Sequence, residues 1–125
     1  MFELTINEQV YQFNPGMRFL RNINQTAYRR YDNGMQEEAG LAKAVASLID
    51  GNLDALVDML FMANEGQSPR VTKMLLDSYI EDAATDIDAL VEEWLDFLKQ
   101  SNATKKIVAP MMEAVARAKE QKEGS

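Results

Sequence analysis

Apolar and polar residues alternate in two short runs at the start of the chain, over residues 2–13. The runs flank Asn7-Glu8, and a period of two on each side of a two-residue loop predicts a β-hairpin. The expected pairing is Phe2 with Phe13, Leu4 with Tyr11 and Ile6 with Gln9, which places five apolar side chains on one face. A lone hairpin is marginally stable in water, so either helices of the chain or another molecule must cover that face.

From residue 15 to about residue 122 the apolar positions follow helical spacing instead. Asn14-Pro15 is typical of a helix start, because Asn caps well and the missing N–H of proline is harmless in the first turn. We expect this helix to end before the turn at residues 32–34. A second helix is predicted at about residues 36–50, and Asn52 can cap a third.

The second half of the chain predicts three further helices. Ser68-Pro69 repeats the cap-and-proline pattern, and Thr85, followed by acidic residues, is typical of the next helix start. The last helical pattern covers about residues 104–122 and contains Pro110. Proline inside a helix costs about 3 kcal/mol, so we expect a kink or a new helix start there. The place of segment 107–125 in the domain stays open.

Together these elements predict one mainly α domain over residues 1–125. It consists of an N-terminal β-hairpin, about residues 2–13, followed by a compact bundle of about five to six helices over residues 15–122. The length suits a single domain, and the chain contains no fixed-period repeat or low-complexity linker that would divide it.

Composition narrows the possible chemistry. The 125 residues include no cysteine and no histidine, so the usual nucleophile, the usual neutral-pH base and the zinc ligands are missing. We therefore expect no enzyme activity, no cofactor and no metal, and an enzyme that uses carboxylates alone is the weakest alternative. No run of apolar residues is long enough to cross a membrane and no signal peptide precedes the hairpin, so we expect a soluble, unprocessed protein.

Two acidic stretches resemble calcium loops only in part. Residues 82–93 place acids at several ligand positions, but Ala84 and Ile87 occupy positions that need an acid and a glycine. Residues 50–61 also lack that glycine, and Phe61 replaces the final glutamate. Both stretches are better interpreted as helix ends with capping acids.

A cluster of arginines near two tyrosines suggests a second function. These residues are Arg18, Arg21, Arg29 and Arg30, with Tyr28 and Tyr31. They favour contacts with acidic protein surfaces, or with nucleic acid in a small helical regulatory protein. The net charge of -7 weakens the nucleic-acid alternative, because binding to phosphates needs clustered positive charge.

Eight methionines also stand out in a chain of this size. Met59 and Met62 lie off the main apolar stripe of their predicted helix, and Met111 and Met112 follow Pro110. Flexible methionine side chains fill gaps in cores or line surfaces that accept varied apolar partners, and both interpretations stay open.

Beyond these patterns, four stretches in order resemble a known family. They are FELTINEQVYQF at residues 2–13, DGNLDALVDMLFMAN at 50–64, SYIED at 78–82 and TDIDALVEEWLDFLKQSNATKK at 85–106. Over residues 2–106 the chain is similar to the tail assembly chaperones of long-tailed, siphovirus-type phages and prophages of Gram-positive bacteria.

The resemblance implies a non-enzymatic protein of the host cytoplasm. Such chaperones coat the long, largely helical tape-measure protein, keep it soluble, help to recruit major tail subunits, and are not retained in the finished virion. A longer form made by ribosomal frameshifting is often produced as well.

The partners expected from this reading are the tape-measure protein, the major tail protein and further copies of the chain, with no nucleic acid and no membrane. We expect the first helices to cover part of the hairpin face and a neighbouring copy to use the exposed edge of the hairpin. The residues predicted to contact partners are Phe2, Leu4, Tyr11, Phe13, Met59, Met62, Met111 and Met112.

Overall fold

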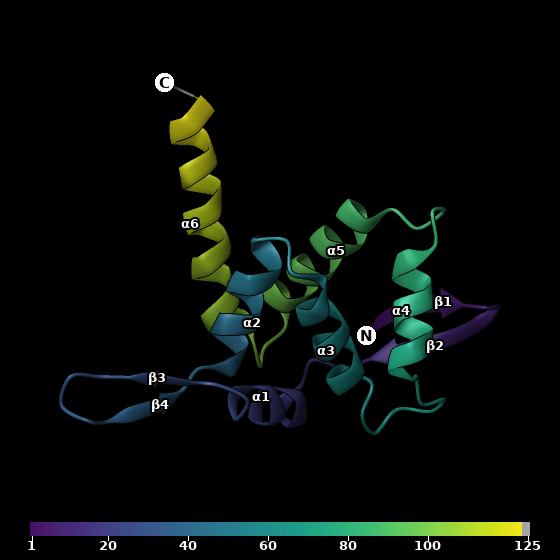
Figure 1. Ribbon diagram of the computed structural model, residues 1–125, viewed down its shortest axis with the longest axis horizontal. Helices are drawn as coiled ribbons and strands as arrows, with labels where there is room; N and C mark the ends of the chain where they lie inside the picture. Colours follow the sequence, from purple (N-terminus) through teal and green to yellow (C-terminus); the bar gives the residue numbers. More distant parts are fainter. Residues whose placement is uncertain (124–125) are drawn as a thin grey trace.

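A computed structural model describes residues 1–123, and residues 124–125, the end of segment 107–125, lie outside the described part. Within it the chain forms six helices and two antiparallel pairs of strands (Figure 1). In chain order these are β1 (Phe2–Ile6), β2 (Gln9–Phe13), α1 (Met17–Asn24), β3 (Tyr28–Arg30), β4 (Gln36–Glu38), α2 (Gly40–Ile49), α3 (Leu53–Ala63), α4 (Lys73–Glu81), α5 (Ile87–Gln100) and α6 (Lys105–Glu123). The predicted mainly α fold with an N-terminal hairpin is confirmed.

The first hairpin has the predicted register. Phe2 pairs with Phe13 and Leu4 with Tyr11. Asn7 and Glu8 both have positive φ, 51° and 68°, which gives the tight turn whose twist matches that of the flanking strands. The five apolar side chains of the shared face are all buried. Residues of the same chain therefore cover this face in the structure. This is the first of the two possibilities that the sequence left open.

The aromatic cover of the hairpin comes from α5, far along the chain. The ring of Phe2 lies 5.1 Å from that of Trp94 and 5.6 Å from that of Phe97, both edge to face, an arrangement that adds to the stabilisation from burial. Phe19 of α1 packs on Trp94 at 6.2 Å. Of the first helices, α1 contributes to this aromatic cluster through the contact of Phe19 with Trp94.

A second hairpin replaces part of the helices predicted between residues 15 and 50. Helix α1 ends at Asn24 and α2 begins only at Gly40, so both predicted boundaries are wrong. Tyr and Arg side chains in β3 tolerate extended backbone, and the turn expected between two helices is the tip of a hairpin, where Gly34 has φ 86°. Strands β3 and β4 form an arm that projects from the body (Figure 1).

The root of this arm is held where α2 crosses the end of α1. A side chain at Gly40 would clash with the carbonyl oxygen of Ile23, so only glycine permits this close approach. The backbone N–H of Leu41 donates to Oδ1 of Asn24 at 3.0 Å, which satisfies a free donor at the start of α2. These two contacts hold the start of α2 against the end of α1, next to the strands of the arm.

Three helix starts differ in detail from those expected. Helix α1 begins at Met17, after Gly16, and not at Asn14-Pro15. Helix α4 begins after Thr72, whose hydroxyl accepts from Leu75 N–H at 3.1 Å, and not at Ser68-Pro69. Helix α5 is capped by Asp86, whose carboxylate accepts from Ala89 N–H, while Thr85 donates to the Tyr79 carbonyl. For α4 and α5, a neighbouring side chain with the same capping ability takes the position.

Helix α6 continues through Pro110 without a new start, contrary to one expectation. Pro110 and Lys106 are both on the exposed side of the helix. The Lys106 carbonyl that proline leaves without a partner can therefore bind water, which makes the interruption tolerable.

Helix α3 begins after Asn52, as predicted. The side chain of Asn52 caps it by accepting from Asp54 N–H at 3.1 Å.

A buried asparagine joins the first hairpin to α3 and to the segment before α4. Asn64 is 0% exposed. Its Nδ2 donates to the carbonyls of Gln12 (2.9 Å) and Pro69 (3.2 Å), and its Oδ1 accepts from Val71 N–H and from Arg70, both at 2.7 Å. One side chain at the end of α3 thus satisfies polar groups from two other segments in a place that water does not reach.

Replacing this residue should cost far more than replacing an exposed asparagine. In Asn64→Ala we expect the free energy of unfolding, measured by urea denaturation, to fall by about 3 kcal/mol, because buried partners lose their hydrogen bonds. Asn102→Ala, at an exposed position, should change it by less than about 0.5 kcal/mol. Equal effects of the two substitutions would contradict this role of Asn64.

Candidate partner-binding groove

An open groove with a volume of about 710 Å³ is lined by α5, α6 and residues around the turn from α2 to α3. We call it the α5–α6 groove. Its apolar lining is Leu48, Ile49 and Leu53 from the end of α2 and the start of α3, Ile87, Val91 and Leu95 from α5, and Met112 and Val115 from α6.

Helix α5 forms this groove because its apolar surface is wider than the core requires. Leu90, Trp94 and Leu98 form one row and are buried. Ile87 and Val91, one turn apart, belong to a second row and are only half-buried. Residues spaced by four lie above one another on a helix, so this second row gives the groove a continuous apolar wall.

Helix α6 supplies the opposite wall and then leaves the body. It packs against α5 and α2, and Figure 1 shows its C-terminal part extending away from the other helices. Met112 and Val115 are half-buried, whereas residues 116–121 are exposed. The groove is therefore open along one side, which suits an elongated partner better than a small molecule.

Three charged side chains also line the groove. Asp88 and Glu92 lie one turn apart on α5, and Lys119 lies on α6. All three are exposed. The apolar floor therefore has an acidic edge on one side and a basic residue on the other.

The two adjacent methionines of α6 lie on different surfaces. Met112 lines the α5–α6 groove, whereas Met111 and Ile107 line a second cavity of about 370 Å³ together with Ala42, Ala46, Lys43 and Arg29. Neighbouring helix residues point about 100° apart, so the pair cannot form one continuous patch. Both are half-buried, so each keeps part of its side chain accessible beside its cavity.

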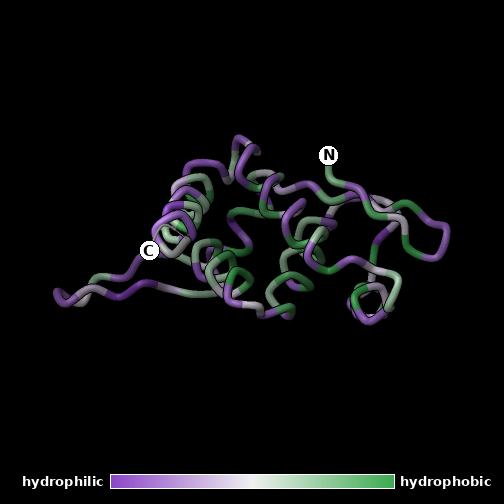
Figure 2. The backbone as a smooth tube through the Cα atoms, turned by 90° about the horizontal axis from the view of Figure 1, so that it is seen from above, coloured by the Kyte–Doolittle hydropathy of each residue, from purple (hydrophilic) through white to green (hydrophobic). Residues whose placement is uncertain are grey.

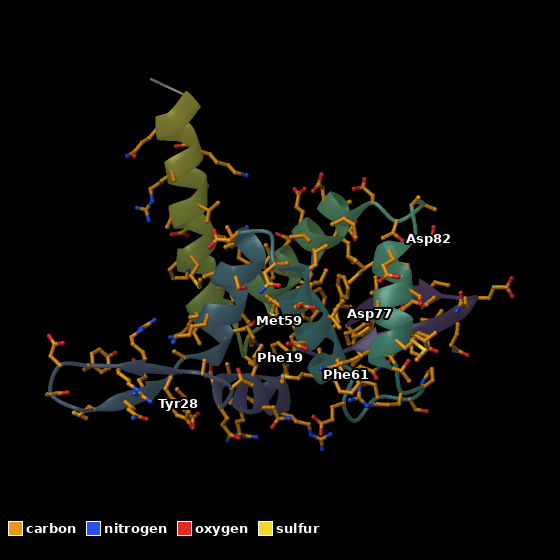
Figure 3. All side chains as sticks on the ribbon, viewed as in Figure 1. Phe19, Tyr28, Met59, Phe61, Asp77 and Asp82 are labelled. Atoms are coloured by element: carbon orange, nitrogen blue, oxygen red, sulfur yellow. The ribbon has the colours of Figure 1, made fainter. Side chains whose placement is uncertain are left out.

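The other predicted contact residues lie in or near the core. Phe2, Leu4, Tyr11 and Phe13 are buried in the first hairpin. Met59 is also buried, and Figure 3 shows it among the helices of the body. Met62 is half-buried beside a cavity of about 140 Å³. A partner has no access to the buried five in this fold, and Met59 fills space in the core.

The predicted arginine cluster is divided between separate contacts. Arg18 of α1 lies against Gly66, whereas Arg29 on the arm lies 3.8 Å from the carboxylate of Glu37. Tyr31 also donates to that carboxylate. Arg29 of the arm thus faces an acid of the same hairpin, which does not favour the nucleic-acid alternative.

The arm carries three exposed large apolar side chains outside the groove. Tyr28 is 45% exposed, Tyr31 46% and Met35 65%. All six residues of β3 and β4 are exposed, and Figure 2 shows the arm as a thin extension beyond the helices. β3 carries Arg29 and Arg30, and β4 carries Glu37 and Glu38. The arm is therefore a further surface available to a partner.

Neither acidic stretch brings carboxylates together as a metal site would. Among residues 1–123, no group of three or more acidic side chains is placed to hold an ion. Asp82 accepts from Ala84 N–H and Asp86 caps α5, so both make local backbone contacts.

Among the described residues 1–123, no helix combines the length and the apolar character needed to cross a bilayer.

The sequence contained a signal for the groove, but helical periodicity alone did not distinguish it from the signal for the core. In the sequence, Ile87 and Val91 follow the same helical spacing as Trp94, although in the structure they are half-buried beside its buried row. Two parallel rows on one helix indicate two packing surfaces. The arm had no comparable signal, because Tyr28 to Tyr31 fit a helix or a strand equally well.

A family model described as phage tail assembly chaperone protein, TAC, matches residues 3–113. The match begins in β1 and ends in α6 beyond Pro110, so it includes Met111, Met112 and the α5 wall of the groove, whereas Val115 and Lys119 of the α6 wall lie beyond it. Comparisons with curated proteins and with solved structures gave no match.

Two substitutions on the first hairpin test whether its apolar face is core. Leu4→Asp would bury a charge without a partner, so we expect loss of the cooperative thermal transition in circular dichroism. Val10→Asp, on the other face at a side chain that is 42% exposed, should leave the transition almost unchanged. A stable, folded Leu4→Asp monomer would show instead that this face is an interface between copies.

Proposed function

Because the chain belongs to the phage tail assembly chaperone family, we propose that it binds the tape-measure protein in the host cytoplasm and keeps it soluble during tail assembly. It also helps to recruit major tail subunits and leaves before the virion is complete. The observation that carries this proposal is the open, apolar α5–α6 groove. The role is that of a chaperone, and it requires no reaction.

The groove has the features of a site for an amphipathic helix. Six of its apolar residues, from α2, α3, α5 and α6, are only half-buried, so together they present apolar surface to solvent. A contiguous patch of this kind on a soluble domain is typical of an interaction site. An apolar helix face laid between two helices is a recurrent mode of recognition, and a long helical client exposes many such faces before it is assembled.

The arm supports self-association of the chaperone along this client. Short, exposed edge strands offer free backbone groups to a further strand. With arginines on β3 and glutamates on β4, an edge of one copy is complementary in charge to the opposite edge of another. We therefore assign the contact between copies to the arm, in addition to the edge of the first hairpin.

Co-expression with the tape-measure protein tests the groove directly. The wild-type chain should keep this client in the soluble fraction and co-purify with it. Val91→Asp places a charge in the apolar wall, so we expect at least a tenfold loss of soluble client at equal chaperone levels. Val10→Asp, outside the groove, is the matched control and should behave like the wild type.

Both variants are first compared with the wild type by thermal melting, so that a loss of client is not confused with unfolding. If the wild-type chain leaves the tape-measure protein insoluble and no complex forms, the proposed function is wrong. If Val91→Asp retains the client as well as Val10→Asp does, the function stands and the groove is not the binding site.

The contact through the arm is tested by the mass of the isolated chaperone in analytical ultracentrifugation. Tyr28→Ser/Met35→Ser removes two exposed apolar side chains, so the oligomer mass should fall while the melting temperature stays within a few degrees. Met74→Ser, which removes a side chain that is 78% exposed on α4, should leave the mass unchanged. An unaltered mass in the double variant would exclude the arm as the contact between copies.

A further inference from the structure

The acidic edge of the α5–α6 groove has no counterpart within the chain. Asp88 and Glu92 are exposed on the same side of α5. In the described residues 1–123, neither carboxylate takes part in an ion pair or a side-chain hydrogen bond. Their spacing of four residues aligns them along the groove. Two unpaired charges therefore flank the apolar wall formed by Ile87 and Val91.

The acidic character continues along the outer side of α5. Glu92 also borders a shallow cavity of about 360 Å³ together with Glu93 and Asp96. In this group, Asp96 lies 3.7 Å from Lys99. The α5–α6 groove itself has one basic residue, Lys119, on the wall opposite α5. A cleft lined mainly by one sign of charge focuses its potential on the ligand, so charge should select among helices with similar apolar stripes.

We propose that the α5–α6 groove selects an amphipathic helix that carries Lys or Arg on the flank facing α5. The apolar stripe of such a helix covers Val91, Leu95 and Met112, and its basic flank lies beside Asp88 and Glu92. This inference rests on the proposed function and specifies the chemistry of the client segments that are bound. Lys119 faces the other flank, where a neutral or acidic residue fits better than a second basic one.

The same charges disfavour other occupants. An acidic helix, including α5 of a second copy, would bring carboxylates beside Asp88 and Glu92, and like charges in close contact are unfavourable. A helix with neutral flanks would bury the apolar wall but leave both carboxylates partly desolvated and unpaired. The groove and the arm are thus different surfaces, one for a basic-flanked client and one for further copies.

Two synthetic peptides of about 18 residues, alanine-rich so that each forms a helix, provide the test. Both carry the same leucine stripe, and one flank contains lysines in the first peptide and glutamates in the second. Fluorescence anisotropy with the full-length chain at low salt should give a dissociation constant about fivefold lower for the lysine peptide, because two exposed ion pairs form. The difference should shrink as salt screens these pairs.

A neutral variant and a matched control locate the effect. Asp88→Asn/Glu92→Gln retains the shape of the groove and should bind both peptides equally. Glu81→Gln/Asp77→Asn removes the same amount of charge from exposed positions on α4 that do not line the groove and should keep the fivefold preference. Thermal melting of both double variants shows that they are folded.

The inference is overturned if the wild-type chain binds both peptides equally or binds neither, or if the neutral variant keeps the preference. These outcomes are distinct from failure of the proposed function. A chain that keeps the tape-measure protein soluble without preferring the lysine peptide overturns only the charge selection. A chain that prefers the lysine peptide but leaves the tape-measure protein insoluble overturns only the proposed client.

Discussion

The packing of the first hairpin against Trp94 is the interaction on which the rest of the structure depends. It brings residues near the start of the chain against α5, near its end, and so closes the core around rings from β1, β2, α1 and α5. The Trp94 indole N–H has no hydrogen-bond partner among residues 1–123, so Trp94 acts here through its apolar surface. Because the row of α5 that contains Trp94 packs against the hairpin, the second row, with Ile87 and Val91, remains available to form another surface.

This division of α5 connects the fold to the proposed function. A helix that only covered the hairpin would need one apolar stripe, whereas α5 has Trp94 on one side and Val91 on the border of the α5–α6 groove. Helix α6 completes the groove and extends past it (Figure 1). The core therefore fixes the wall of the groove in place, so that a client helix meets a surface that is already formed.

Features that depend on local pattern could be predicted from the sequence, and features that depend on competition between similar alternatives could not. The register of the first hairpin follows from its alternation and from the tight turn at Asn7-Glu8. At the start of α5, Thr85 and Asp86 are both good caps, and only the packed structure decides between them. The segment from Tyr28 to Arg30 has no period that distinguishes strand from helix, so the arm was missed.

The candidate site was predicted only in part, for a related reason. The sequence shows that a side chain is apolar, but burial depends on what packs against it. Met112 and Met59 are the same residue type in similar helical patterns, yet one borders the groove and the other is enclosed by the core. Charge was more informative, since the acids that favoured a protein partner over nucleic acid include Asp88 and Glu92 beside the groove.

Methionine methyl resonances offer the most direct measurement of the central claim, that the α5–α6 groove binds the client. The chain has methionines in the groove (Met112), in the core (Met59) and on the outer side of α4 (Met74). In NMR spectra of the methyl-labelled chaperone, complex formation with the tape-measure protein should shift the Met112 signal and leave those of Met59 and Met74 nearly unchanged. A large shift at Met74 with an unchanged Met112 signal would contradict the account.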